Sequence, residues 1–298
     1  MARSNTPAHA QKKIVFILGG GAAFGAHQAG ALDYLVGSGI RPDAIIGSSV
    51  GIVNALFYAA RGVEGMLEAW NSMNSLQVLI GPSLTRNPII GNSLMSMGRM
   101  VRWVERKVDF ERAFKSKTEL RFVLLDLTTG RTFLRGNRTE KTADDFRTVS
   151  HIGYRIPILY PPIKFEGHYW CDGGFAWNIP VEAAIEMGAG TIYILSVIRR
   201  QLPEARRFPT LAHVSYRMME VMWAGQGNSN RERALVDRGT YHGARIVDIE
   251  PREYLGTDPV SILWTSPHKA RRLIEMGRED AARVIESTPA HRAANTPA

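Results

Sequence analysis

The sequence of 298 residues contains a single cysteine, Cys171. One cysteine cannot form an intrachain disulfide, which excludes a disulfide-stapled scaffold and a metal site built from several thiolates. Long apolar runs are also missing. Two uncharged stretches, 14–32 and 44–60, contain glycines and polar side chains such as Gln28 and Asn54, which hydrocarbon would leave unsatisfied. We therefore expect no membrane-spanning helix.

A secretory leader is poorly matched as well. Lys12 and Lys13 precede the apolar run 14–18, but that run is shorter than the roughly 7 to 15 residues of a signal-peptide core. We therefore expect a cytoplasmic protein.

Acidic residues are fewer than basic ones, 28 against 37, and the net charge is +9. This balance favours anionic partners such as nucleic acid, acidic lipid surfaces or anionic substrates. No nucleic-acid reader motif occurs, so nucleic acid is not an expected partner. Basic residues gather in 99–117 and at Arg199, Arg200, Arg206 and Arg207. They predict peripheral contact with the inner, anionic face of a membrane, with a solvated basic surface as the alternative.

Short apolar runs alternate with helical patterns, which indicates an α/β fold with a mainly parallel sheet. Apolar residues make up 45% of the chain and charged residues 22%, as in ordinary globular proteins. We expect one domain over 12–287, with loose tails at 1–11 and 288–298. Strands are predicted at 14–18, 44–46, 121–127, 191–197 and 244–249. Helices are predicted at 26–36, 50–60, 180–187 and 267–286.

One further helix is predicted from spacing alone. Leu94, Met97, Val101, Val104 and Val108 recur at intervals of three and four residues, which places them on one helical face. We expect this face to cover the core, and a lipid-facing flap is the alternative.

A glycine run, Gly19 to Gly25, lies between the first predicted strand and helix. Gly20 and Gly25 have the spacing of a phosphate loop, but Ala26 and His27 follow where Lys and Ser or Thr are needed. A dinucleotide fingerprint also misses by one residue in either frame. The run leaves backbone N–H groups at a helix start, which suits an oxyanion hole; a tight turn without a ligand is the alternative.

A candidate nucleophile follows the second predicted strand. Gly47-Ser-Ser-Val-Gly51 matches G-x-S-x-G, in which the serine sits on a sharp turn between strand and helix. Glycines Gly47 and Gly51 allow the close backbone approach that such a turn requires. Ser49 is therefore the predicted nucleophile, whereas Ser48 stands one place too early.

A serine hydroxyl needs a base. Asp172 ends an aromatic, strand-like segment and precedes Gly173 and Gly174, so it is the predicted base, with an ordinary Asp-Gly turn as the alternative. A histidine could serve instead in a triad. The chain offers histidines after Ser49 at positions 151, 168, 213, 242, 268 and 291.

These segments together resemble the patatin-like phospholipases, serine lipid acyl hydrolases with a Ser-Asp dyad. The resemblance is best over 12–198. It is carried by 19–32, 47–55, 157–162 and 172–174, and by the shorter matches 178–180 and 188–190.

The resemblance implies a three-layer α/β/α sandwich and an enzyme that cleaves carboxylic esters of phospholipids or related acyl lipids. It implies Ser49 as nucleophile, Asp172 as base, and an oxyanion hole at Gly19, Gly20 and Gly21. No cofactor and no metal are implied.

The chain departs from the family pattern in two places. Phe24 stands where many members carry Arg or Lys, and Ala22 where many carry a fourth glycine. Gly153 and Arg155 replace small Ser and Ala residues before Pro157. These departures remove no atom of the dyad, but they alter the pocket or the hole and leave the substrate range open. A silent lipid-binding or scaffold protein of the same fold, and a histidine-dependent hydrolase of small esters, are the alternatives.

Overall fold

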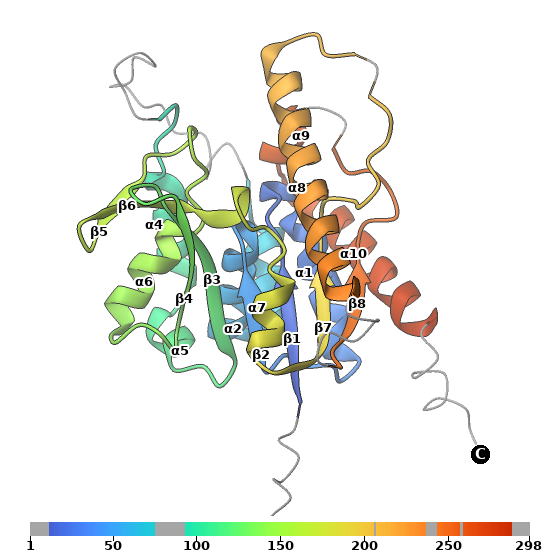
Figure 1. The fold of residues 1–298 in the computed structure, drawn as a ribbon, viewed down its shortest axis with the longest axis horizontal. Helices are drawn as coiled ribbons and strands as arrows, with labels where there is room; N and C mark the ends of the chain where they lie inside the picture. Colours follow the sequence, from blue (N-terminus) through green and yellow to red (C-terminus); the bar gives the residue numbers. More distant parts are fainter. Residues whose placement is uncertain (1–11, 75–92, 206, 237–242, 257–258, 288–298) are drawn as a thin grey trace, which may run out of the picture.

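The computed structural model describes residues 12–74, 93–205, 207–236, 243–256 and 259–287 (Figure 1). The strands in these ranges form one sheet in the order β5-β6-β3-β2-β1-β7-β8, and β4 pairs with β3. Neighbouring strands from β3 to β8 on this path are parallel, and the pairs that involve β4, β5 and β6 are antiparallel. The strands are β1 (Lys13–Leu18), β2 (Ala44–Gly47), β3 (Glu119–Asp126), β4 (Arg131–Arg135), β5 (Ile163–Phe165), β6 (His168–Asp172), β7 (Ala189–Leu195) and β8 (Arg245–Ile249).

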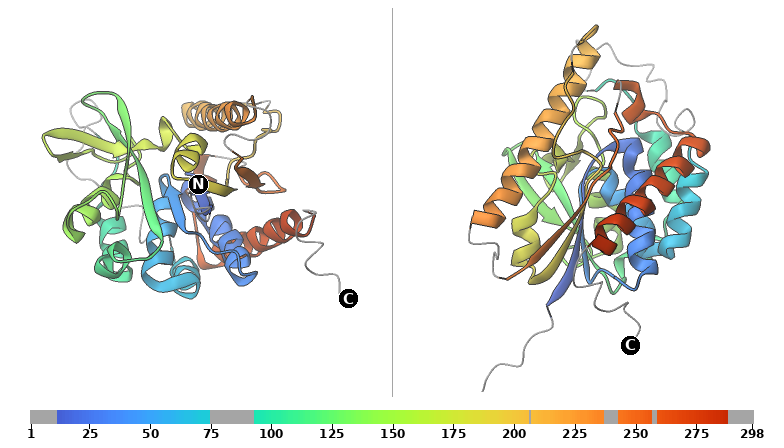
Figure 2. Two further views of the ribbon diagram at one scale, coloured as in Figure 1. Left: turned by 60° about the horizontal axis from the view of Figure 1, so that its bottom comes forward. Right: turned by 90° about the vertical axis from the view of Figure 1, so that its right-hand side faces the viewer.

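Helices cover both faces of this sheet, which confirms the predicted α/β fold (Figures 1 and 2). One face carries α1 (Gly25–Gly37), α2 (Val50–Asn71) and α10 (Pro267–Ser287), and the other carries α7 (Val181–Glu186) and α8 (Leu211–Val236). The remaining helical segments are η1 (Ala22–Phe24), α4 (Gly98–Lys107), α5 (Phe110–Phe114), α6 (Ala143–Ile152), η2 (Gly173–Phe175) and α9 (Pro259–Leu263).

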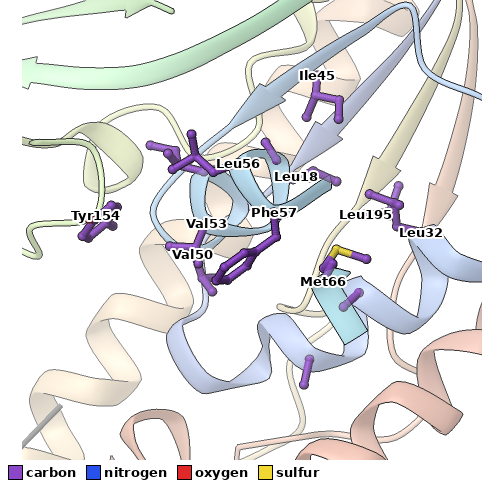
Figure 3. Close-up of a cluster of buried hydrophobic side chains, with 14 of the residues drawn as sticks. Leu18, Leu32, Ile45, Val50, Val53, Leu56, Phe57, Met66, Tyr154 and Leu195 are labelled. Atoms are coloured by element: carbon purple, nitrogen blue, oxygen red, sulfur yellow. The ribbon is translucent and has the colours of Figure 1, made fainter. Parts of the chain in front are cut away.

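Alternation along β1 explains why the sheet needs two covers. Val15 and Ile17 belong to the buried cluster on the α7 side, whereas Phe16 and Leu18 belong to the cluster on the α1 and α2 side. Successive side chains of a strand point to opposite faces, and all four are fully buried. Figure 3 shows Leu18 gathered in one cluster with side chains of α2.

Most predicted elements occur close to their predicted bounds, but strands β4 and β5 were not predicted. Helix α2 continues past the predicted end at 60, across a non-helical Gly62, to Asn71. Helices α5, α6, α8 and α9 were not predicted. The predicted tails, residues 81–92 and Arg206 lie outside the described residues. In the part of the chain that is described, no helix is both long and apolar enough to span a membrane.

Helix α4 resolves the two alternatives for the segment after 93. Met100, Trp103 and Val104 are buried, and the Trp103 ring meets Phe57 of α2 edge-on at 5.3 Å between centroids. The helix therefore covers the core. Leu94 lies before the helix and is exposed.

Candidate active site

Ser49 occupies a strained turn between β2 and α2. Its φ and ψ are 52° and −121°, a backbone region that costs a non-glycine residue on the order of 1–3 kcal/mol. A Cβ at Gly51 would lie 2.0 Å from the Leu18 carbonyl oxygen, so only glycine permits this close approach. The turn therefore has the strained strand-to-helix form of a nucleophile elbow, and Ser49 borders a cavity.

The neighbouring Ser48 has a different role. Its hydroxyl donates a hydrogen bond to the main-chain carbonyl of Asn178 at 3.1 Å. Ser48 is thus engaged with the segment that precedes α7 and is absent from the cavity lining.

Asp172 ends β6 and is 1% exposed. The Gly174 N–H donates to its Oδ1 at 2.8 Å, and a Cβ at Gly173 would lie 2.8 Å from backbone atoms of β3. Burial raises the pKa of Asp172 to about 7, against a lowering by the Ser49 hydroxyl and the Gly174 N–H. The Ser49 hydroxyl thus lowers the pKa of the Asp172 carboxyl. Among the described residues, Oδ2 of Asp172 has no hydrogen-bond partner.

The glycine loop lies directly beside Ser49. A Cβ at Gly20 would be 2.9 Å from the Ser49 Cβ, so the fold brings the predicted loop and nucleophile together. Two of the three predicted N–H donors already have acceptors. The Gly19 N–H donates to the Leu195 carbonyl at 3.3 Å, and the Gly20 N–H donates to Asn178 Oδ1 at 2.6 Å. The Gly21 N–H has no acceptor among the described residues.

Asn178 is a site residue whose role the sequence did not reveal. Its side chain is buried and fixes the Gly20 N–H, and its carbonyl accepts from Ser48. It therefore joins the glycine loop to the turn before α7, across 158 residues of sequence.

A second buried polar chain holds the loop from the helical side. Gln28 donates to the carbonyls of Gly19 at 3.1 Å and Leu195 at 2.8 Å. Asn54 donates to Gln28 Oε1 at 2.8 Å, and Trp70 Nε1 donates to Asn54 Oδ1 at 2.7 Å. The signal for this chain was present in the sequence, because Gln28 and Asn54 are polar residues in otherwise apolar stretches.

The cavity beside Ser49 is apolar and has a volume of about 50 Å³. Its wall includes the Trp70 ring and the side chains of Met73, Met97, Met100, Trp103, Tyr154, Ile156 and Tyr160. Methionine side chains are flexible and fill irregular gaps. Such a wall can adjust to an inserted hydrocarbon chain.

The departures from the family pattern have local structural roles. The Lys269 ammonium lies 5.1 Å from the centroid of the buried Phe24 ring, a favourable cation–π contact. A Cβ at Gly153 would lie 2.2 Å from Ile52 Cδ1, so glycine lets this segment approach α2. The Arg155 carbonyl accepts the Asp172 N–H at 3.0 Å.

Several histidines of the described ranges form hydrogen bonds with groups other than Ser49. His151 bonds to Glu105 and Tyr154, His168 to Asp126, and His27 to Asp280. No hydrogen bond links a histidine of the described ranges to Ser49.

The comparisons with known proteins agree with this geometry. A family model described as patatin-like phospholipase matches residues 16–185. Among solved structures, the fold is similar to that of VipD from Legionella pneumophila, with a TM-score of 0.53 and 12% identity over 93% of this chain and 67% of that one. No curated protein sequence matches the chain. Because the family model spans more than half of the sequence, the chain belongs to the patatin-like phospholipase family of lipid-hydrolysing enzymes.

Proposed function

We propose that this lipid acyl hydrolase cleaves carboxylic esters of phospholipids or related acyl lipids with Ser49 and Asp172 alone. The observation that carries the proposal is the buried Asp172 carboxylate, which has one unpartnered oxygen and lies beside the strained Ser49. Its pKa of about 7 suits a general base at neutral pH. No histidine is needed.

In the proposed reaction, the Ser49 oxygen attacks the ester carbonyl carbon while Asp172 accepts the hydroxyl proton. The tetrahedral intermediate expels the alcohol, which takes the proton from Asp172. Water then attacks the acyl-enzyme ester while Asp172 accepts its proton. The second tetrahedral intermediate releases the fatty acid as the bond to the Ser49 oxygen breaks, and that oxygen takes the proton back from Asp172.

The oxyanion needs N–H donors that are free to turn to it. The Gly21 N–H meets this condition among the described residues, as does the N–H of Val50, the residue after the nucleophile. The Gly20 N–H would have to leave Asn178 Oδ1 to contribute. We therefore assign Gly21 and Val50 as the principal donors, and Gly19 and Gly20 as the backbone that positions Gly21.

The apolar cavity supports an acyl chain as the bound part of the substrate. It begins at Ser49 and is walled by aromatic and methionine side chains. A long chain exceeds its volume of about 50 Å³, so binding requires the methionines to move. Peripheral contact with an anionic membrane surface is part of the proposal, because the substrate resides there and the chain is basic.

The test combines labelling with two substitutions. A fluorophosphonate should form an adduct at Ser49, found by mass spectrometry. Ser49→Ala and Asp172→Asn should each lower ester hydrolysis by more than a thousandfold without loss of the fold. An adduct at Ser48, or activity within tenfold of wild type in either variant, would refute the dyad. His151→Phe serves as the control and should keep the reaction.

A further inference from the structure

The outer face of helix α8 exposes a continuous set of apolar side chains. Leu211, Val214, Met218, Val221 and Met222 are spaced by three, four, three and one residues, which places them on one side of the helix. Their exposed fractions run from 39% for Val214 to 81% for Leu211, and Phe208 before the helix is 47% exposed. We call these six residues the α8 stripe.

The opposite side of α8 packs against the rest of the protein. Tyr216, Glu220 and Trp223 are buried, the Tyr254 hydroxyl donates to Glu220 at 2.7 Å, and the Trp223 ring meets Phe175 at 5.5 Å. The helix is therefore held firmly by its inner side. The stripe is not a misplaced core face, because the inner side of α8 already packs against the rest of the protein.

The stripe lies on an element that contacts the catalytic turn. Gln226 of α8 donates to the Phe175 carbonyl at 2.7 Å, and Phe175 belongs to η2, which directly follows Asp172. In Figures 1 and 2, the end of α8 where the helix begins rises beyond the carboxyl ends of the parallel strands, the edge at which Ser49 lies. A partner on the stripe is thus held next to the active site.

Apart from the α8 stripe, two exposed apolar side chains lie next to the segment that lines the cavity. Leu94 and Ile158 are 53% and 75% exposed, and the Leu94 N–H donates to the Ile158 carbonyl at 2.9 Å. Ile156 and Tyr160, two residues to either side of Ile158, line the cavity. Apolar side chains are therefore also exposed next to the segment that lines the cavity.

Charge identifies the partner. Residues 199–222 hold five arginines and two glutamates, and Glu220 is buried against Tyr254 and Arg217. Arg207 is exposed and precedes Phe208 of the stripe, and Arg200 is exposed where its carbonyl accepts a hydrogen bond from Asn228, farther along α8. An apolar helix face flanked by arginines is typical of binding to an anionic bilayer, in which the apolar side enters the headgroup region.

A second copy of the chain fits the stripe less well. Residues 211–222 span roughly 17 Å at 1.5 Å per residue, and a helix is about 10 Å wide, so the face offers on the order of 170 Å². A stable dimer buries about 800 Å² on each partner. A shallow insertion into lipid needs no more than a stripe.

We infer that the α8 stripe is the surface by which this protein docks onto anionic lipid bilayers. The inference rests on the proposed function in taking lipid as the partner, yet binding can be measured without turnover. The stripe enters between the headgroups, and Arg200 and Arg207 contact lipid phosphates. Docking then presents the cavity rim at the surface from which substrate is taken.

The experiment measures co-sedimentation of the full chain in the Ser49→Ala background, which excludes hydrolysis during binding. The vesicles are phosphatidylcholine with and without 30% phosphatidylglycerol. Leu211→Gln/Met218→Gln should weaken binding to the anionic vesicles at least tenfold, and Arg200→Gln/Arg207→Gln should remove its salt dependence. Leu127→Gln is the matched control, because Leu127 is 46% exposed after β3, and it should change binding less than twofold.

A direct probe supplements the binding curves. Met218→Trp should shift the tryptophan emission to shorter wavelength on anionic vesicles, because the ring enters an apolar environment. An unshifted emission, or wild-type binding by Leu211→Gln/Met218→Gln, would overturn the inference. Dissociation of a wild-type dimer by that variant in sedimentation velocity would also overturn it, in favour of a second copy on the stripe.

Failure of the proposed function is distinguishable from failure of this inference. With Ser49 present, Leu211→Gln/Met218→Gln should keep the wild-type kcat/KM on a short, water-soluble ester, because no residue of the stripe lines the cavity beside Ser49. A wild-type protein that binds vesicles but forms no adduct at Ser49 would refute the dyad and leave the docking surface standing.

Discussion

Replacement of Asp172 by Asn should stabilise the protein while it abolishes catalysis. The pKa of this buried carboxyl is raised from 3.8 to about 7, so the folded protein binds a proton that the unfolded chain has already lost over this range. The free energy of unfolding that this group contributes is fully present below pH 3.8 and is lost as the pH rises from 3.8 through 7. At 1.36 kcal/mol per pKa unit, the loss reaches about 4 kcal/mol at pH 8 and about 2 kcal/mol at pH 5.

Asn has the same shape and no charge, so the variant avoids this loss. Its carbonyl oxygen can accept the Gly174 N–H, and its amide group can donate to the Ser49 oxygen in place of the unpartnered Oδ2. Urea unfolding at 25 °C should therefore give Asp172→Asn a higher free energy of unfolding than wild type at pH 8. The difference should shrink by about half at pH 5.

The control is the buried Asp126, whose pKa moves in the opposite direction. Burial raises that pKa, but hydrogen bonds from Thr129, His168 and the Thr128 N–H outweigh it and hold it at about 2. Asp126→Asn should lower stability at both pH 5 and pH 8, because Asp126 is ionised at both. An Asp172→Asn variant that is less stable than wild type at pH 8, or whose difference does not change with pH, would refute the argument.

The same pKa predicts the activity profile: kcat/KM of wild type should rise with pH through about 7, because only the ionised Asp172 accepts the Ser49 proton, and a flat profile from pH 5 to 8 would contradict this. Gln28→Met keeps the length of the side chain but removes its donor to Gly19 and Leu195, so kcat per titrated site should fall about 10²- to 10³-fold with KM nearly unchanged. If fewer active sites reacted with the fluorophosphonate but kcat per reactive site were unchanged, Gln28 would serve the fold alone. Cys171 is buried, and burial followed by the nearby Asp172 charge raises its thiol pKa to about 12, so Cys171→Ala should keep activity within about twofold, and a complete loss would contradict this. Hydrolysis should persist in EDTA, because backbone N–H groups stabilise the oxyanion; loss of activity that calcium restores would contradict that assignment.

The central strands were predictable because each is a continuous apolar run. Residues 15–18 and 192–195 are buried, as expected for strands of a sheet that is covered on both faces. Helix α8 was missed for the opposite reason. Its buried side includes Glu220 and Arg231, while Leu211 and Met218 face outward, so the usual relation between apolar periodicity and core does not hold. Its inner side is defined by tertiary contacts, those of Glu220 with Tyr254 and of Trp223 with Phe175, which sequence spacing does not predict.

The predicted site residues divide in a similar way. Ser49 and Asp172 could be proposed from the sequence because each lies in a local motif with its own glycines. The free N–H donors were not, because their availability depends on residues far along the chain. Asn178 occupies the Gly20 N–H and Gln28 fixes the Gly19 carbonyl, and neither contact follows from sequence spacing. Local motifs predict which residues react, whereas tertiary contacts decide which donors are free.

The energetic cost of the site and the rigidity of its surroundings belong together. Ser49 carries on the order of 1–3 kcal/mol of backbone strain, and the buried Asp172 costs about 4 kcal/mol at pH 8 by the pKa given above. Neither group could keep its position in a mobile segment, because relaxation of the turn or hydration of the carboxylate would release that energy. The Gly51 backbone packs directly on Leu18, and the Asp172 N–H is bonded to Arg155. These contacts oppose both kinds of relaxation, so the fold itself holds the geometry in which we propose that Ser49 and Asp172 react.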